Sequence, residues 1–150
     1  MSTPSHTTPE NFVKFAWELN LRVSSADSGL LDPYFIKNVT EMAQKSDIEV
    51  YYLDFSQYKT AIEALSAKEN AEFVAAIDDG SKQSLLWFVN CESLAPLNVD
   101  ITYSLRTILT NRSSNNTQSV FIAKKEALQQ MFSNHQAAFY QSHFPLTGYF

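Results

Sequence analysis

The chain has few of the residues that cross-link a protein, anchor it in a membrane or attract it to nucleic acid. Cys91 is the single cysteine among 150 residues, which excludes an internal disulfide and a paired-cysteine zinc or redox site. Lysine and arginine number 11 against 16 aspartates and glutamates, and the net charge of -5 argues against a nucleic-acid partner. No unbroken apolar run exceeds five residues, as at 85–89, so no membrane insertion is expected.

The remaining composition is that of a folded domain. With 45% hydrophobic and 18% charged residues, a chain of this size buries roughly 68–70% of the surface that its unfolded form exposes. Residues 1–8 show no apolar periodicity and are expected to form a flexible arm, followed by a single α/β domain over residues 9–150. The first residues, Met1 to Pro4, lack the basic and apolar regions of a secretion signal, which predicts a cytoplasmic protein.

Strand-like and helix-like segments alternate along the chain. Strands are expected at a short segment ending near Ser24 and at 48–55, 84–90 and 118–123. Helices are expected from Thr8, from Asp32, twice within 60–79, after residue 98 or 100, and over 125–132. Such alternation indicates parallel strands joined by right-handed crossovers. The predicted fold is a three-layer α/β sandwich with a mostly parallel sheet of four or five strands.

In a parallel sheet, ligands bind beyond the carboxyl ends of the strands, so the segment after the first strand is a candidate site. A loop is expected over 24–29, where Ser24 and Gly29 stand at the spacing of the two glycines in the phosphate-binding loop G-x-x-x-x-G-K-[ST]. The next two residues are leucines, which offer neither the lysine that neutralises phosphate charge nor the hydroxyl that binds magnesium. The segment is either an ordinary loop or a degenerate phosphate loop comprising Ser24, Ser25, Ser28, Gly29, Leu30 and Leu31.

The third strand ends at Asn90, Cys91 and Glu92, where a working ATPase has aspartate followed by glutamate. Asn90 is neutral and supplies no anionic contact to magnesium. Cys91 is expected to be a partly buried, inert thiol. Candidate ligand contacts are Asp54, the carboxylate inside an apolar strand, and Lys124, which follows the fourth strand.

No metal site is predicted, because His135 and His143 are eight residues apart. This spacing matches neither H-E-x-x-H nor a helical i, i+4 pair. No G-x-S-x-G nucleophile elbow occurs either.

Taken together, these segments resemble the core of the P-loop ATPases, in particular their AAA-like and STAND-like branch. The resemblance spans 19–140 and lies in the hydrophobic pattern: the loop at 24–29 before a helix, the strands at 48–55 and 85–90, and the strand at 119–123 before a helix. It implies the strand order 1-4-3-2. Because every diagnostic polar residue is altered, it also implies a scaffold without ATPase activity and without a cofactor. Such scaffolds commonly serve as docking or regulatory modules.

The sequence thus predicts a non-catalytic module of a bacterial-type cytosol that binds another protein, either an ATPase or a second copy of itself. Its candidate interface comprises Arg106 and two aromatic residues near the end of the chain, Phe139 and Tyr140. The aromatic tail has an equal alternative, which is to fold back over the sheet as core.

Two other functions stay open. The first is a small α/β enzyme or ligand-binding protein that uses Asp54, Glu92 and Lys124, which requires these three side chains to converge on one pocket. The second is a DNA-associated regulator, supported by Arg106 and Arg112 and opposed by the acidic balance of the chain.

Overall fold

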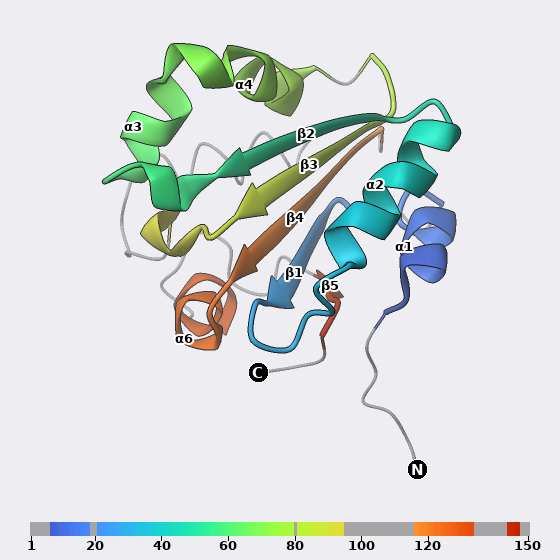
Figure 1. The fold of residues 1–150 in the computed structure, drawn as a ribbon, viewed down its shortest axis with the longest axis horizontal. Coiled ribbons are helices and arrows are strands. Elements are labelled where there is room, and N and C mark those ends of the chain that lie inside the picture. Colours follow the sequence, from blue (N-terminus) through green and yellow to red (C-terminus); the bar gives the residue numbers. More distant parts are fainter. Residues whose placement is uncertain (1–6, 19–20, 80, 95–115, 134–143, 148–150) are drawn as a thin grey trace.

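The computed structural model describes residues 7–18, 21–79, 81–94, 116–133 and 144–147. Five strands form one sheet in the order β2-β3-β4-β1-β5, and every pairing is parallel (Figure 1). The strands are β1 Val23–Asp27, β2 Glu49–Asp54, β3 Ser84–Val89, β4 Thr117–Ala123 and β5 Phe144–Pro145. The order 1-4-3-2 of the first four strands confirms the predicted α/β topology.

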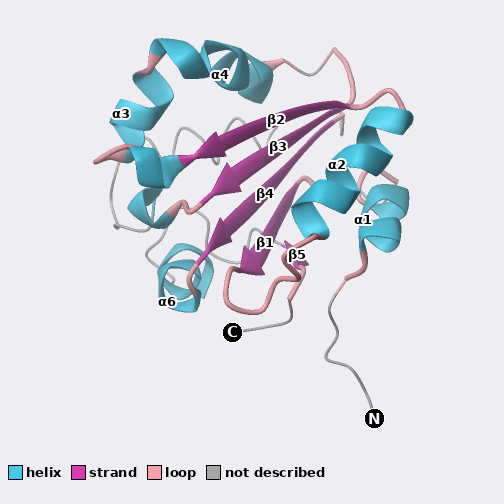
Figure 2. Ribbon diagram, in the orientation of Figure 1, coloured by secondary structure: helices cyan, strands magenta, loops and turns pink. Residues whose placement is uncertain are grey.

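Helices cover both faces of this sheet, which gives the three expected layers (Figure 2). One face is covered by α1 Pro9–Phe15 and α2 Phe35–Lys45. The other is covered by α3 Ala61–Ser66, α4 Ala71–Asp78 and α6 Lys125–Leu128. No helix among the described residues is long and apolar enough to span a membrane.

Local capping signals explain where several helices begin. Asn11 N donates to Thr8 Oγ1 at 3.2 Å, which confirms Thr8 as the N-cap of α1. Glu63 N donates to Thr60 Oγ1 at 3.1 Å and caps α3 in the same way. The prediction that α2 begins at Asp32 was wrong by one turn, because Asp32 Oδ1 accepts from Tyr34 N at 2.8 Å and forms a turn before the helix.

The first strand was also predicted wrongly. It runs from Val23 to Asp27 instead of ending near Ser24. Ser24 and Ser25 lie in the sheet between Val120 and Phe121 of β4 on one side and β5 on the other. Pairing on both sides fixes this polar segment as a strand, although serine and aspartate have little intrinsic preference for one.

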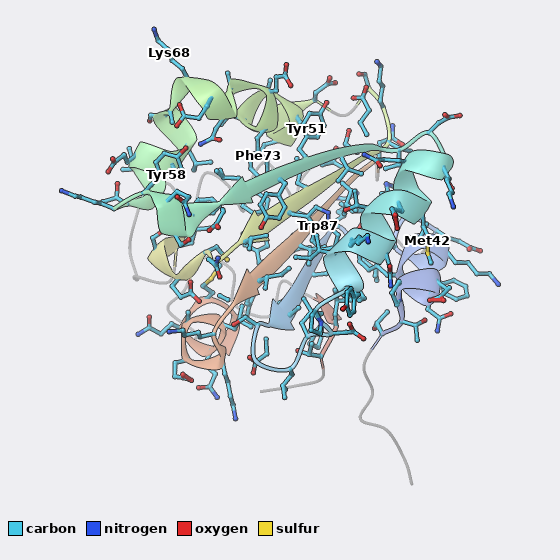
Figure 3. All side chains as sticks on the ribbon, viewed as in Figure 1. Met42, Tyr51, Tyr58, Lys68, Phe73 and Trp87 are labelled. Atoms are coloured by element: carbon cyan, nitrogen blue, oxygen red, sulfur yellow. The ribbon has the colours of Figure 1, made fainter. Side chains whose placement is uncertain are left out.

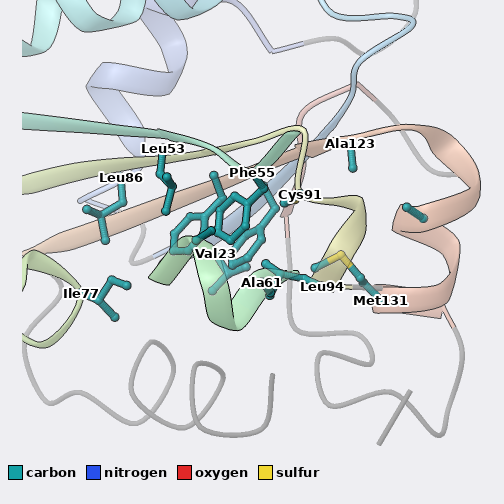
Figure 4. Packing of buried hydrophobic residues seen from close by; sticks show 14 of the residues in the cluster. Val23, Leu53, Phe55, Ala61, Ile77, Leu86, Cys91, Leu94, Ala123 and Met131 are labelled. Atoms are coloured by element: carbon teal, nitrogen blue, oxygen red, sulfur yellow. The ribbon is translucent and has the colours of Figure 1, made fainter. Parts of the chain in front are cut away.

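Two apolar clusters hold the layers together. The first contains Phe55 and Leu86 among its members (Figure 4). Phe88 of β3 lies at its centre, with ring centroids 4.3 Å from Phe121, 5.0 Å from Phe73 and 6.0 Å from Phe55. In the second, Trp87 points from β3 toward α2 (Figure 3), and its indole N–H donates to the hydroxyl of Thr40 at 3.1 Å. Neighbouring side chains of one strand thus enter opposite layers, as the pleat requires.

Candidate functional site

Backbone hydrogen bonds join the carboxyl ends of β1, β4 and β3, at the end of the sheet where these strands finish. Ser28 N donates to the carbonyl of Ala123 at 2.9 Å, and Cys91 N donates to the carbonyl of Ile122 at 3.2 Å. This end of the sheet is where a parallel α/β protein binds its ligands. It therefore contains the candidate site predicted from the sequence.

The backbone N–H groups of the segment after β1 all donate to acceptors within the chain. The N–H groups of residues 28–31 donate in turn to the Ala123 carbonyl (2.9 Å), to Asp27 Oδ1 (2.8 Å) and twice to the Asp27 carbonyl (3.0 and 2.9 Å). A phosphate loop works by directing successive free N–H groups at its anion. Here the side-chain carboxylate of Asp27, a residue that is 7% exposed, accepts from Gly29 N, and backbone carbonyl oxygens accept from the other three N–H groups. A carboxylate at this position also repels phosphate.

The predicted bounds of the phosphate loop were consequently wrong. Ser24 and Ser25 are buried residues of β1, so neither belongs to a loop. Ser28 and Gly29 form an exposed turn, and α2 begins six positions after Gly29, at Phe35. A phosphate loop of the ATPase type leads directly into its helix, whereas this connection contains a second turn.

The two leucines that replace lysine and serine or threonine lie on this connection. Leu30 is 56% exposed and Leu31 is partly buried. Beside them lies a cavity of about 200 Å³, whose lining contains one charged residue and is otherwise apolar or neutral. Its lining residues are Thr7, Thr8, Pro9, Leu30, Leu31, Asp32, Phe35, Leu146 and Thr147. A cavity with a carboxylate and no cation in its lining does not suit a phosphate.

Asn90 has a structural reason to be asparagine. Its φ of 52° is left-handed, a conformation that asparagine tolerates better than most residues. Its side-chain amide donates to Asp54 Oδ1 at 3.0 Å. The same oxygen accepts from the N–H and hydroxyl of Ser56 at 2.9 and 2.6 Å and caps the turn Phe55–Gln57. Asn90 and Asp54 thus join the ends of β3 and β2.

The hydrogen bonds at Asp54 outweigh the effect of its partial burial. Burial on its own would raise the pKa of this carboxyl, but the hydrogen bonds from Ser56 and Asn90 lower it by more. The net pKa of Asp54 is below its ordinary value, so the group is ionised at neutral pH. This is the opposite of the raised pKa that a general acid needs.

Glu92 and Cys91 join β3 to β4. Glu92 Oε2 accepts from the backbone N–H of Lys124 at 2.7 Å. Cys91 is fully buried, and its sulfur lies 3.5 Å from the carbonyl oxygen of Ile122. Burial, followed by the negative charge of Glu92, raises the pKa of the thiol well above its ordinary value. The reactive thiolate is therefore disfavoured, and the segment 90–92 fastens three strand ends together.

The three residues proposed for an enzyme have separate partners. Asp54 binds Asn90 and Ser56, whereas Glu92 binds the backbone of Lys124, whose side chain is exposed. Neither the 200 Å³ cavity nor a wider hollow of about 430 Å³ beside α1 is lined by any of the three. The described residues also contain no group of three histidine, cysteine or acidic side chains placed to hold a metal ion.

Other predicted residues lie outside the described part of the chain. These are Arg106, Arg112, His135, Phe139, Tyr140 and His143. The sequence analysis missed Asp27, which holds the turn after β1 through its side chain and its carbonyl. The sequence Asp-Ser-Gly is a signal for such a turn, because aspartate accepts from the backbone two residues ahead.

No family model and no curated protein matches the chain.

Replacing Asp54 by alanine is expected to lower the free energy of unfolding by about 1 kcal/mol at pH 7, as the loss of a helix cap does. Screening by solvent keeps the effect of this partly exposed charge small. The folded-state pKa is depressed, so this stabilisation is present above the unfolded-state pKa and is lost as pH falls through the folded value. Urea unfolding of both proteins at pH 7 and about pH 3 should show the difference shrinking in acid. An equal difference at both pH values would contradict the assignment, and Asp54→Asn serves as the uncharged control.

Proposed function

We propose that this chain is a non-catalytic domain with a P-loop-ATPase-like scaffold that acts by binding another protein. The observation that carries the proposal is that the backbone N–H groups at 28–31 all donate hydrogen bonds within the chain, three of them to Asp27. A nucleotide phosphate would have to displace the Asp27 carboxylate from the Gly29 N–H and backbone carbonyls from the other three N–H groups. Leu30 provides no lysine to offset the phosphate charge.

The acidic part of an ATPase site is replaced in the same way. The position that supplies the anionic contact to magnesium holds Asn90, whose amide is bound to Asp54. Glu92, the next candidate carboxylate, accepts from the backbone of Lys124. Residues at both halves of the site therefore stabilise the fold, and this supports a scaffold that no longer hydrolyses nucleotide.

Exposed apolar side chains support a protein partner. Leu30 and Tyr34 are 56% and 66% exposed, and both lie on the connection between β1 and α2. Tyr52 and Ile62 are 54% and 57% exposed. Aromatic residues are enriched at protein interfaces. The proposal includes a cytoplasmic location and a partner that is an ATPase or a second copy, with Arg106, Phe139 and Tyr140 as further candidate contacts.

Calorimetric titration of the full chain with ATP or GTP and magnesium is expected to give no binding heat, and no phosphate should be released. A matched variant, Leu30→Lys with Leu31→Ser, restores the residue types of the phosphate loop but leaves Asp27 in place. It is also expected not to bind, because the backbone N–H groups stay occupied. Micromolar binding with hydrolysis by the native chain would overturn the proposal.

A further inference from the structure

The two edges of the sheet differ in how far they are open to another strand. The β5 edge is two residues long and contains Pro145. The β2 edge is six residues long and pairs in unbroken register with β3, from Glu49 opposite Ser84 to Asp54 opposite Val89. Proteins usually blunt such an edge with charged side chains, proline or a bulge. The sequence EVYYLD of β2 contains no proline, and its charged residues stand only at its two ends, which leaves the central four residues without either device.

The outer side of β2 offers backbone groups that have no partner among the described residues. Glu49 N donates to the carbonyl of Gln83, next to β3, at 3.1 Å. In a parallel ladder, alternate residues direct both backbone groups to the same side, so Tyr51 and Leu53 also face β3. Val50, Tyr52 and Asp54 then face outward. Among the described residues, no backbone group bonds to Val50 or Tyr52 from that side.

Side chains above and below this edge suit an extended peptide. Tyr52 is 54% exposed and pairs with Trp87 in the ladder, so the two side chains share a face of the sheet. Tyr51 is half-buried on the opposite face, toward α4 (Figure 3). A strand added beside β2 would lay successive side chains alternately against these two tyrosines. Backbone pairing would then supply affinity, and the tyrosines would supply selectivity.

The charge around the edge is acidic. Glu49 and Asp54 stand at the two ends of β2, and the carboxylates of Glu72 and Asp79 lie close enough to Tyr51 to contribute to its raised pKa, after its hydrogen bond to Glu49 and its burial. Lys82 Nζ lies 3.6 Å from Glu49 Oε1 in an exposed ion pair. A second copy would bring its own acidic edge to the same ladder, which like-charge repulsion disfavours.

We propose that the outer edge of β2 binds an extended, basic segment of a partner protein, which adds to the sheet as a further strand. The inference rests on the proposed function and names the docking surface through which it would operate. Lysine or arginine at the two ends of the segment would face Glu49 and Asp54, while its central residues pair with Val50 and Tyr52.

The test uses fluorescein-labelled peptides of eight residues, in which threonine and valine alternate between two terminal lysines. Binding to the full chain is followed by anisotropy at low salt. Replacing both lysines by glutamate is expected to weaken binding about tenfold or more. Methylating every second backbone nitrogen leaves one edge of the peptide able to pair and is expected to have little effect. Methylating all of the backbone nitrogens between the lysines blocks both edges and is expected to weaken binding about tenfold or more.

Two variants at one position separate backbone pairing from side-chain contact. Tyr52→Pro removes an outward N–H but none of the hydrogen bonds to β3, as an edge strand allows. It is expected to weaken the lysine peptide about tenfold. Tyr52→Thr removes the aromatic ring, as Tyr52→Pro does, but keeps the backbone N–H. Its affinity for the lysine peptide is expected to be within about threefold of that of the native chain. Circular dichroism and urea unfolding check that both variants fold.

Three results would overturn the proposal: no binding of the lysine peptide at about 1 mM, equal binding of the glutamate peptide, or equal binding of both methylated peptides. The methylated peptides probe the native chain, so the test stands even if Tyr52→Pro fails to fold. Sedimentation that shows a native dimer and a monomeric Tyr52→Pro variant would assign the edge to a second copy instead. Nucleotide binding would overturn the proposed function while leaving these peptide results unaffected.

Discussion

Replacing Phe88 by alanine is expected to lower the free energy of unfolding by about 3–5 kcal/mol. The Phe88 ring is fully buried and contacts Phe121 on the neighbouring strand, Phe73 on α4 and Phe55 beyond the end of β2. Its removal therefore leaves a cavity bounded by three separate elements, which cannot all move in to fill it. Urea unfolding should show a lower midpoint at an unchanged slope.

The matched control for this substitution is Tyr52→Ala on the adjacent strand. Tyr52 loses an aromatic ring as well, but its side chain is 54% exposed, so the expected cost is below about 1 kcal/mol. Comparable losses for the two variants would show that Phe88 is not the centre of this cluster.

Cys91 is expected to react with a thiol reagent about a thousandfold more slowly in the folded chain than in urea. The reagent must reach the sulfur and needs it as a thiolate. Burial of Cys91 prevents access, and it also raises the pKa of the thiol, so that less thiolate forms. Reaction then waits for opening of the structure, whose free energy approaches that of global unfolding in a core. Since the chain has one cysteine, colour release from Ellman's reagent reports this thiol alone.

An exposed thiol provides the control for this measurement. Ser81 is exposed, so Ser81→Cys combined with Cys91→Ala should react at nearly the rate of the unfolded chain. Rapid labelling of native Cys91 would contradict its burial between β3 and β4. It would also reopen a chemical role for the segment at 90–92.

The strands that could be predicted from the sequence are those whose own residues favour extension. The segments at 48–55 and 84–90 contain aromatic and β-branched side chains, and the structure contains β2 and β3 there. The strand β1 could not be bounded in this way, because Ser24, Ser25 and Asp27 are polar. Its extent is set by pairing with β4 and β5, which lie far along the chain.

The same limit applies to the candidate site. The sequence has leucine at position 30 in place of lysine and asparagine at position 90 in place of aspartate. From these two replacements a loss of nucleotide hydrolysis could be predicted. What could not be predicted is that Asp27 would take three of the N–H groups, because this requires β1 to end at Asp27. Asn90 was interpreted from its lost charge alone, whereas its left-handed backbone and its contact with Asp54 depend on where β3 turns.

The position of β1 between β4 and β5 has a consequence for the order in which the protein acquires its structure on the ribosome. Asp27 N donates to the hydroxyl of Thr147, 120 positions later. At about 5–20 residues per second, a nascent β1 waits roughly 6–24 s before that partner has even been synthesised. Throughout that interval its serines and aspartate stay hydrated at little cost, whereas an apolar strand in the same place would favour aggregation.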